Sequence, residues 1–225
     1  MPWTSQPIKV YESIFSLEKP FTKSDFLSLL FYMGYLSYDT SKPFRAFAMP
    51  NYVIKQLYLE FFINLLAEKE QLALKEDKVS DAIVKMAFEG NIKPFFNIIQ
   101  DILTTLSNRD YINFDEKYIK LLIIATSFMA DSYYMKSERE VQNGYVDILF
   151  FERPPNQVNY QYIFELKYLR KSEEKQLEAV TKEASQQLQN YIQNEPSLAK
   201  LENLRAVVLV VVKDQLHIFE EKARF

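Results

Sequence analysis

The chain has 225 residues, a formal net charge of −3 and 48% hydrophobic residues, a composition typical of a folded protein rather than a disordered or fibrous one. It has no cysteine and one histidine, His217, which excludes disulfides and thiolate metal sites and nearly excludes histidine-based triads. It has three glycines and neither GxxxxGK[ST] nor GxGxxG, so the common nucleotide-binding loops are absent too. Any catalysis must therefore depend on carboxylates, lysine, tyrosine, serine or a hard metal ion.

Nothing in the sequence predicts export or membrane insertion. The first residues, "MPWTSQPIKV", lack a basic segment followed by an apolar one. The longest apolar runs, such as "AVVLVVV", are far too short to span a bilayer. We expect a cytoplasmic protein.

Residues 1–108 are predicted to form a mainly helical domain. Apolar residues at helical spacing predict a helix over "TKSDFLSLLFYMGYL", ending at Gly34, with N-cap candidates Thr22, Ser24 and Asp25. Alternation around "DTSKP" predicts short strands at about 35–38 and 44–48, and Asn51 then precedes a long helix, "YVIKQLYLEFFINLLAEKE". Further helices are expected near 80–88 and 92–106. This order suits a winged-helix-like or lid domain.

Residues 109–225 are predicted to form an α/β domain. A helix capped by Asp115 or Asn113 opens it. Five strands are expected at about 133–142, 145–151, 161–169, 205–212 and 215–221. A second helix is expected between the third and fourth strands, at about 172–193. The apolar run "RAVVLVVV" is typical of a central strand that is buried on both faces.

Two of these strands carry charges inside runs that are otherwise apolar. Strand alternation places Glu165 and Lys167 on one face of their strand. A two-residue turn at Asn143-Gly144 would pair Glu140 with Asp147 across the preceding hairpin. Opposed carboxylates are destabilising unless one is protonated or a cation lies nearby.

The charged residues predict an oxygen-rich site if the third strand lies beside the hairpin. Glu165 would then join the two carboxylates, and Lys167 would border them. Carboxylates without histidine or cysteine suit Mg²⁺ or Mn²⁺ rather than zinc. A cation of this kind can acidify a water molecule and stabilise a phosphodiester under attack, with a lysine orienting the water.

The stretch "GYVDILFF…YIFELKYLRK" resembles the PD-(D/E)XK nuclease superfamily, whose restriction-endonuclease-like core has the order αβββαβ. More narrowly, it is similar to the nuclease-like domain that follows an AAA-ATPase-like domain in many bacterial proteins, with the pattern E-x-x-x-G-R-x-D and then E-x-K. Glu140, Gly144 and Asp147 fall at the first spacing, and Glu165-Leu166-Lys167 gives the second motif. The expected arginine is replaced by Tyr145. "FLSLLFYMGYLSY" and "MPNYVIKQLY" resemble the end of the ATPase-like partner, so an ATPase partner is implied.

The resemblance implies roles for individual residues. Asp147, Glu165 and Lys167 would be catalytic, and the carboxylates of Asp147, Glu165, Glu116 and Glu140 would hold or support Mg²⁺ or Mn²⁺. "QLQNY" resembles the Q-x-x-x-Y helix motif of the exonuclease-like branch. The residues expected to contact nucleic acid are Gln187, Tyr191, Arg170 and Lys171.

Each of these residues also has a structural interpretation. The strand charges could line a solvated face, Gly144 could simply form a turn, and Gln187 and Tyr191 lie one helical turn apart on a plain helix face. Glu116 would be favoured in the first turn of any helix. Two functions therefore stay open: a metal-dependent nuclease acting on DNA, with RNA as an alternative, and a non-catalytic descendant that serves as an interaction or regulatory module.

Overall fold

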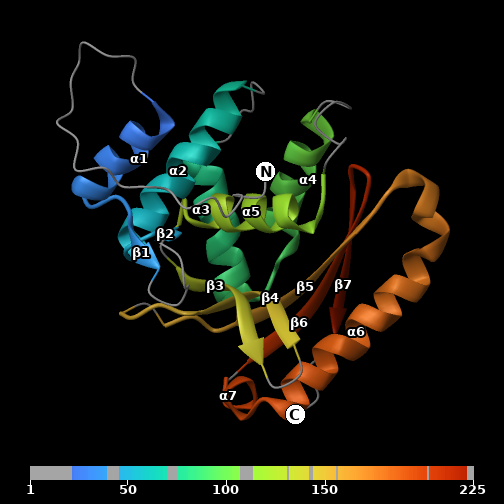
Figure 1. Ribbon diagram of the computed structural model, residues 1–225. Coiled ribbons are helices and arrows are strands. Elements are labelled where there is room, and N and C mark those ends of the chain that lie inside the picture. Colours follow the sequence, from blue (N-terminus) through green and yellow to red (C-terminus); the bar gives the residue numbers. More distant parts are fainter. Residues whose placement is uncertain are drawn as a thin grey trace. The chain divides into compact units, whose positions relative to one another are not determined.

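The computed structural model describes residues 22–39, 46–69, 75–106, 114–130, 132–141, 144–155, 157–201 and 203–221 (Figure 1). The contacts within the chain divide it into two compact units, residues 1–59 and 60–225. In the described part of the chain, no helix has the length and apolarity needed to cross a membrane.

The smaller unit contains the predicted helix and hairpin. Its elements are α1 (Lys23–Tyr32), β1 (Ser37–Asp39), β2 (Ala46–Ala48) and the start of α2 (Tyr52–Lys69). Thr22 caps α1 in a capping box with Asp25, which satisfies backbone N–H groups that have no partner inside the helix. Phe31 packs on Tyr38 and Phe47 of the hairpin, at ring distances of 4.6 and 5.8 Å.

The larger unit is built on a five-stranded mixed sheet in the order β3-β4-β5-β6-β7. Only the β5–β6 pair is parallel. The strands are β3 (Tyr133–Val141), β4 (Gly144–Glu152), β5 (Gln161–Leu169), β6 (Leu204–Val212) and β7 (Gln215–Glu221). Together with the helices α5 and α6 described below, they form the predicted α/β fold with an αβββαβ core.

Helices cover both faces of this sheet (Figure 1). On one face, α6 (Leu177–Asn194) packs Ala184 and Leu188 against a cluster that includes Ile163 and Val208. It follows a short 3₁₀ helix, η3 (Lys171–Gln176), and leads into α7 (Pro196–Ala199). The other face is covered by α3 (Glu76–Val84), the π-helical turn η1 (Lys85–Glu89), α4 (Lys93–Thr105) and α5 (Glu116–Ser127). The apolar run in β6 is buried on both faces, as its composition predicts.

The domain boundary expected after residue 108 falls inside the larger unit, because the helices before it pack on the sheet. Phe96 of α4 contacts Phe164 of β5 at a ring distance of 5.6 Å. The Gln100 amide donates to the Asp214 carbonyl and accepts from the Leu216 N–H, both at 2.7 Å, at the β6–β7 turn. The winged-helix-like or lid character of the first residues stays a prediction.

The predicted register of the β3–β4 hairpin is wrong. Gly144 pairs with Val141 and Glu140 pairs with Tyr145, so Glu140 does not lie opposite Asp147. The reason is that Gly144 is the first residue of β4 rather than part of the turn, which shifts the pairing relative to an Asn143-Gly144 turn. The side chain of Glu140, and residues 142–143, lie outside the described part of the structure.

Candidate functional site

The predicted catalytic residues meet where β4 and β5 separate. These two strands pair only at three positions, from Ile148↔Phe164 to Phe150↔Tyr162. Beyond that point β4 continues beside β3, and β5 continues beside β6 as far as Leu169. Asp147 is the first β4 residue past the paired segment, so it lies at the opening of this fork.

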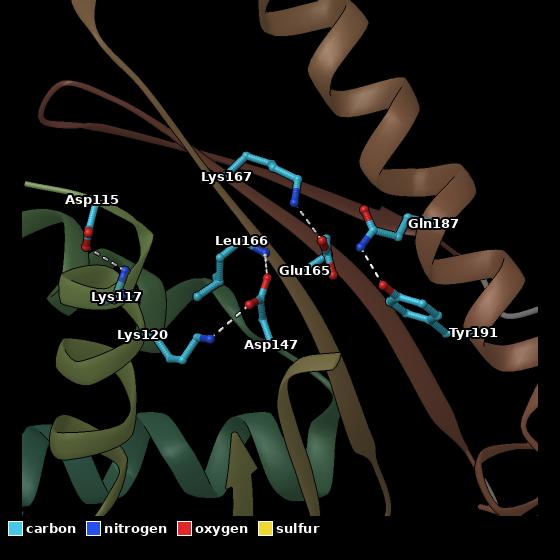
Figure 2. Close-up of polar contacts among 9 residues, drawn as sticks. All are labelled: Asp115, Lys117, Lys120, Asp147, Glu165, Leu166, Lys167, Gln187 and Tyr191. Carbon is cyan, nitrogen blue, oxygen red and sulfur yellow. Dashed lines mark hydrogen bonds and ion pairs between the residues drawn. The ribbon is translucent and has the colours of Figure 1, made fainter. Parts of the chain in front are cut away.

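Asp147 bridges the two diverging strands. Its Oδ2 accepts a hydrogen bond from the backbone N–H of Leu166 on β5, at 3.0 Å (Figure 2). At the fork, β4 no longer supplies backbone acceptors to this part of β5. The Asp147 carboxylate instead accepts the hydrogen bond of the Leu166 N–H, which would otherwise have no acceptor. Asp147 is therefore held in a fixed orientation by the strand that carries Glu165 and Lys167.

Glu165 and Lys167 form a partly buried ion pair. The Lys167 Nζ lies 2.7 Å from Glu165 Oε1, and the Glu165 side chain is only 2% exposed. Glu165 Oε2 is buried and accepts no hydrogen bond from the described part of the chain. Burial raises the pKa of Glu165 from its ordinary value of 4.5 to about 7, although the hydrogen bond from Lys167 lowers it. For Lys167, burial lowers the pKa, but the hydrogen bond and charge of Glu165 outweigh this and raise it, so the ammonium is charged.

Lys120 is a site residue that sequence reasoning missed. Its Nζ lies 3.0 Å from Asp147 Oδ1, and the two side chains are 12% and 18% exposed. It comes from α5, whereas Asp147 comes from β4 (Figure 2). A signal was present in the sequence: Lys120 follows Glu116 by four residues, which places both on one face of a helix.

The structure brings Glu116 to the same site. Asp115 caps α5 by accepting the Lys117 N–H at 2.9 Å, so Glu116 is the first residue of the helix. Burial raises the pKa of Glu116; the charge of Lys167 opposes this, and the charge of Asp147 adds to it. These interactions place the Glu116 carboxyl among the site charges.

Gln187 and Tyr191 project from α6 toward Glu165 (Figure 2). The Gln187 Nε2 donates to the Tyr191 hydroxyl at 2.6 Å. Tyr191 is buried in the apolar cluster beneath α6, whereas Gln187 is half-buried. The pair is thus a hydrogen-bonded unit on the face of α6 that meets the sheet, and its contact with nucleic acid stays a prediction.

The two basic residues predicted to contact phosphates lie just past the end of β5. Arg170 precedes η3 and its backbone N–H donates to Glu173 at 2.8 Å. The Lys171 Nζ lies 2.9 Å from Glu174, and both side chains are exposed. Both residues stay accessible to solvent beside the strand that carries Lys167.

Gly144 is required by a close contact, which gives a testable prediction. Its φ is +146°, and a Cβ there would lie 2.6 Å from the Tyr191 hydroxyl oxygen. We expect Gly144→Ala to lower the free energy of unfolding by about 1–3 kcal/mol, because the backbone is strained and the tyrosine must move. Urea denaturation would measure this. Gly144→Ala in a Tyr191→Phe background, which lacks the crowding hydroxyl, should cost less; an equal loss in both backgrounds would contradict the proposed contact.

The donor atoms at the fork fit a hard divalent cation by their chemistry. Asp147 and Glu165 are oxygen ligands, the kind preferred by Mg²⁺ and Mn²⁺, and Oε2 of Glu165 is buried without a partner among the described residues. Each carboxylate has a lysine as its present counter-ion. Within the described residues, no three acidic, histidine or cysteine side chains are arranged as a ready metal-ligand group.

Comparison with known protein families identifies the family to which this part of the chain belongs. The family model described as the PD-(D/E)XK nuclease superfamily matches residues 114–221, which run from just before α5 to the end of β7. A search of curated proteins found no match. The matched segment contains the fork and all the charged residues described above. Residues 114–221 of this chain therefore belong to the PD-(D/E)XK nuclease superfamily.

Proposed function

We propose that this chain is a divalent-metal-dependent nuclease that hydrolyses phosphodiester bonds of DNA, with RNA as the alternative substrate. The observation that carries the proposal is the convergence of Asp147 with the Glu165–Lys167 pair where β4 and β5 separate. Membership of the nuclease superfamily supports the reaction class.

Asp147 and Glu165 would hold Mg²⁺ or Mn²⁺ together with the backbone carbonyl of Leu166. Glu116, whose carboxyl interacts with the charges of Lys167 and Asp147, would support the bound waters. The cation would supply positive charge for the attacked phosphodiester and would acidify a water molecule.

The chain's own residues would position the reactants. The Leu166 N–H fixes the Asp147 carboxylate, so one ligand is oriented before any cation arrives. Lys167 is charged and lies on the same strand face as Glu165, where it would orient the attacking water. Arg170 and Lys171 would contact phosphates along the bound strand, and Gln187 would approach it from α6. An ATPase partner and a cytoplasmic location stay predictions.

The proposal predicts metal-dependent cleavage that is lost when the metal is removed. The protein would be incubated with linear, circular and single-stranded DNA and with RNA, in Mn²⁺, in Mg²⁺ and in EDTA. We expect cleavage of at least one substrate in Mn²⁺ and none in EDTA, because the carboxylates alone cannot stabilise the charge on phosphate. Lys167→Ala should abolish the cleavage. Equal cleavage by wild type and Lys167→Ala would indicate a contaminating nuclease and would contradict the proposal.

A second function is favoured by the internal ion pairs. Both carboxylates at the fork already have lysine partners, and Tyr145 stands where the family pattern has arginine. A non-catalytic interaction or regulatory module could keep the fold with its charges neutralised in this way. Absence of cleavage on all four substrates in both metals would favour this function.

A further inference from the structure

We propose that Lys120 is a built-in counter-ion that competes with the divalent cation for Asp147 and so limits metal loading of the site. The inference rests on the proposed function, because it concerns the same metal ligands. It assigns a regulatory role to a residue on α5 that belongs to neither sequence motif.

The first argument is geometric. Both Asp147 oxygens are engaged: Oδ2 accepts the Leu166 N–H at 3.0 Å, and Oδ1 contacts the Lys120 ammonium at 3.0 Å. Mg²⁺ binds carboxylate oxygens at about 2.0–2.1 Å. A cation on Oδ1 on that side would therefore fall within the space that the Lys120 Nζ fills, so the ammonium has to leave first.

The second argument is the contrast with Glu165. Lys167 contacts only Oε1 of Glu165, and Oε2 is buried with no partner in the described residues. Glu165 can therefore accept a cation without giving up its lysine, whereas Asp147 cannot do so on its Lys120 side. This difference makes Lys120, rather than Lys167, the residue that opposes metal entry.

The third argument is that Lys120 cannot withdraw by movement of its helix. Its neighbours on α5, Ile119 and Ile123, are fully buried, and Leu122 is nearly so, which fixes the helix in place. The ammonium must therefore leave by a change of side-chain rotamer, while the charge stays close to the site. The Lys120 ammonium and an incoming divalent cation repel each other. Because the Lys120 side chain is only 12% exposed, solvent screens this repulsion weakly.

The test is Mn²⁺ binding by isothermal titration calorimetry, without nucleic acid, so that the readout is independent of cleavage. We expect Lys120→Met to bind Mn²⁺ about tenfold more tightly than wild type, within the range seen when groups around metal ligands are changed. Lys120→Arg retains the positive charge and should stay close to wild type. Lys117→Met, an exposed lysine in the first turn of the same helix, is the matched control and should not change the affinity.

The outcomes separate this inference from the proposed function. If wild type binds Mn²⁺ and Lys120→Met binds it equally or more weakly, Lys120 only supports the fold or the ligand, and the inference is overturned while the metal site stands. Binding by Lys120→Met alone would support the inference in its strongest form. If no variant binds Mn²⁺, both the inference and the metal-dependent function fail.

Discussion

Replacing Glu165 by glutamine should lower metal-dependent cleavage by about 10²–10³-fold, comparable with the loss of one group that stabilises a transition-state charge elsewhere. Glutamine has nearly the same shape and can still accept the hydrogen bond from Lys167, so the fork should keep its geometry. It lacks the negative charge needed to bind the cation, and its amide presents a hydrogen-bond donor to the site. Single-turnover rates at saturating Mn²⁺ would measure the effect.

Two controls make this experiment decisive. Glu178→Gln changes an exposed glutamate of α6 and should leave the rate unchanged. A calorimetric titration of Glu165→Gln should show weakened Mn²⁺ binding in parallel with the lost rate. Near-normal cleavage by a folded Glu165→Gln protein would remove Glu165 from the reaction and leave the strand charges as a structural feature.

Without metal, the protein should lose stability between about pH 4.5 and pH 7 because of Glu165. Its pKa is raised from 4.5 to about 7, mainly by burial, so the folded state keeps a proton that the unfolded chain has already released. The state that binds more protons is favoured at low pH, so this contribution is complete below pH 4.5 and is lost as the pH rises through 7. The raised pKa of Lys167 adds stability that is present below its ordinary value of 10.5 and therefore constant across this window.

Glu165→Gln should therefore become more stable relative to wild type as the pH rises, by on the order of 2–3 kcal/mol across the window. Urea denaturation in EDTA at pH 4.5, 6 and 7.5 would give the free energy of unfolding of each protein. The difference between the two proteins removes the contributions of all other titrating groups, which they share. Glu178→Gln should follow the wild-type curve. A constant difference between Glu165→Gln and wild type at all three pH values would show that the buried carboxyl does not titrate in this range.

The sequence by itself determined the elements of the larger unit and the positions of its charged residues. Alternation with period two identified the strands around Asp147 and Glu165, and the long apolar run of β6 marked a central strand, because these patterns follow from local backbone geometry. The sequence offered Asp115 or Asn113 as the cap of α5, since capping depends on residues within one turn of the helix, and the structure has Asp115. The resemblance of these residues to the PD-(D/E)XK nuclease superfamily is confirmed by the match over 114–221, whereas the narrower resemblance to an ATPase-associated domain stays a prediction.

Only the tertiary structure decided how the charges are neutralised. The Asn143-Gly144 pair predicted a turn whose register would oppose Glu140 and Asp147, but Gly144 belongs to β4, where it lies against Tyr191, a residue 47 positions later. The Lys120–Asp147 pair joins α5 to β4, and Glu165 on β5 is buried in the folded structure. Contacts between residues distant in the chain have no periodic signature in the sequence. For this reason the charged residues on the two strands could be read from the sequence, but Lys120 beside Asp147, the ion pairs and the raised pKa of Glu165 could not.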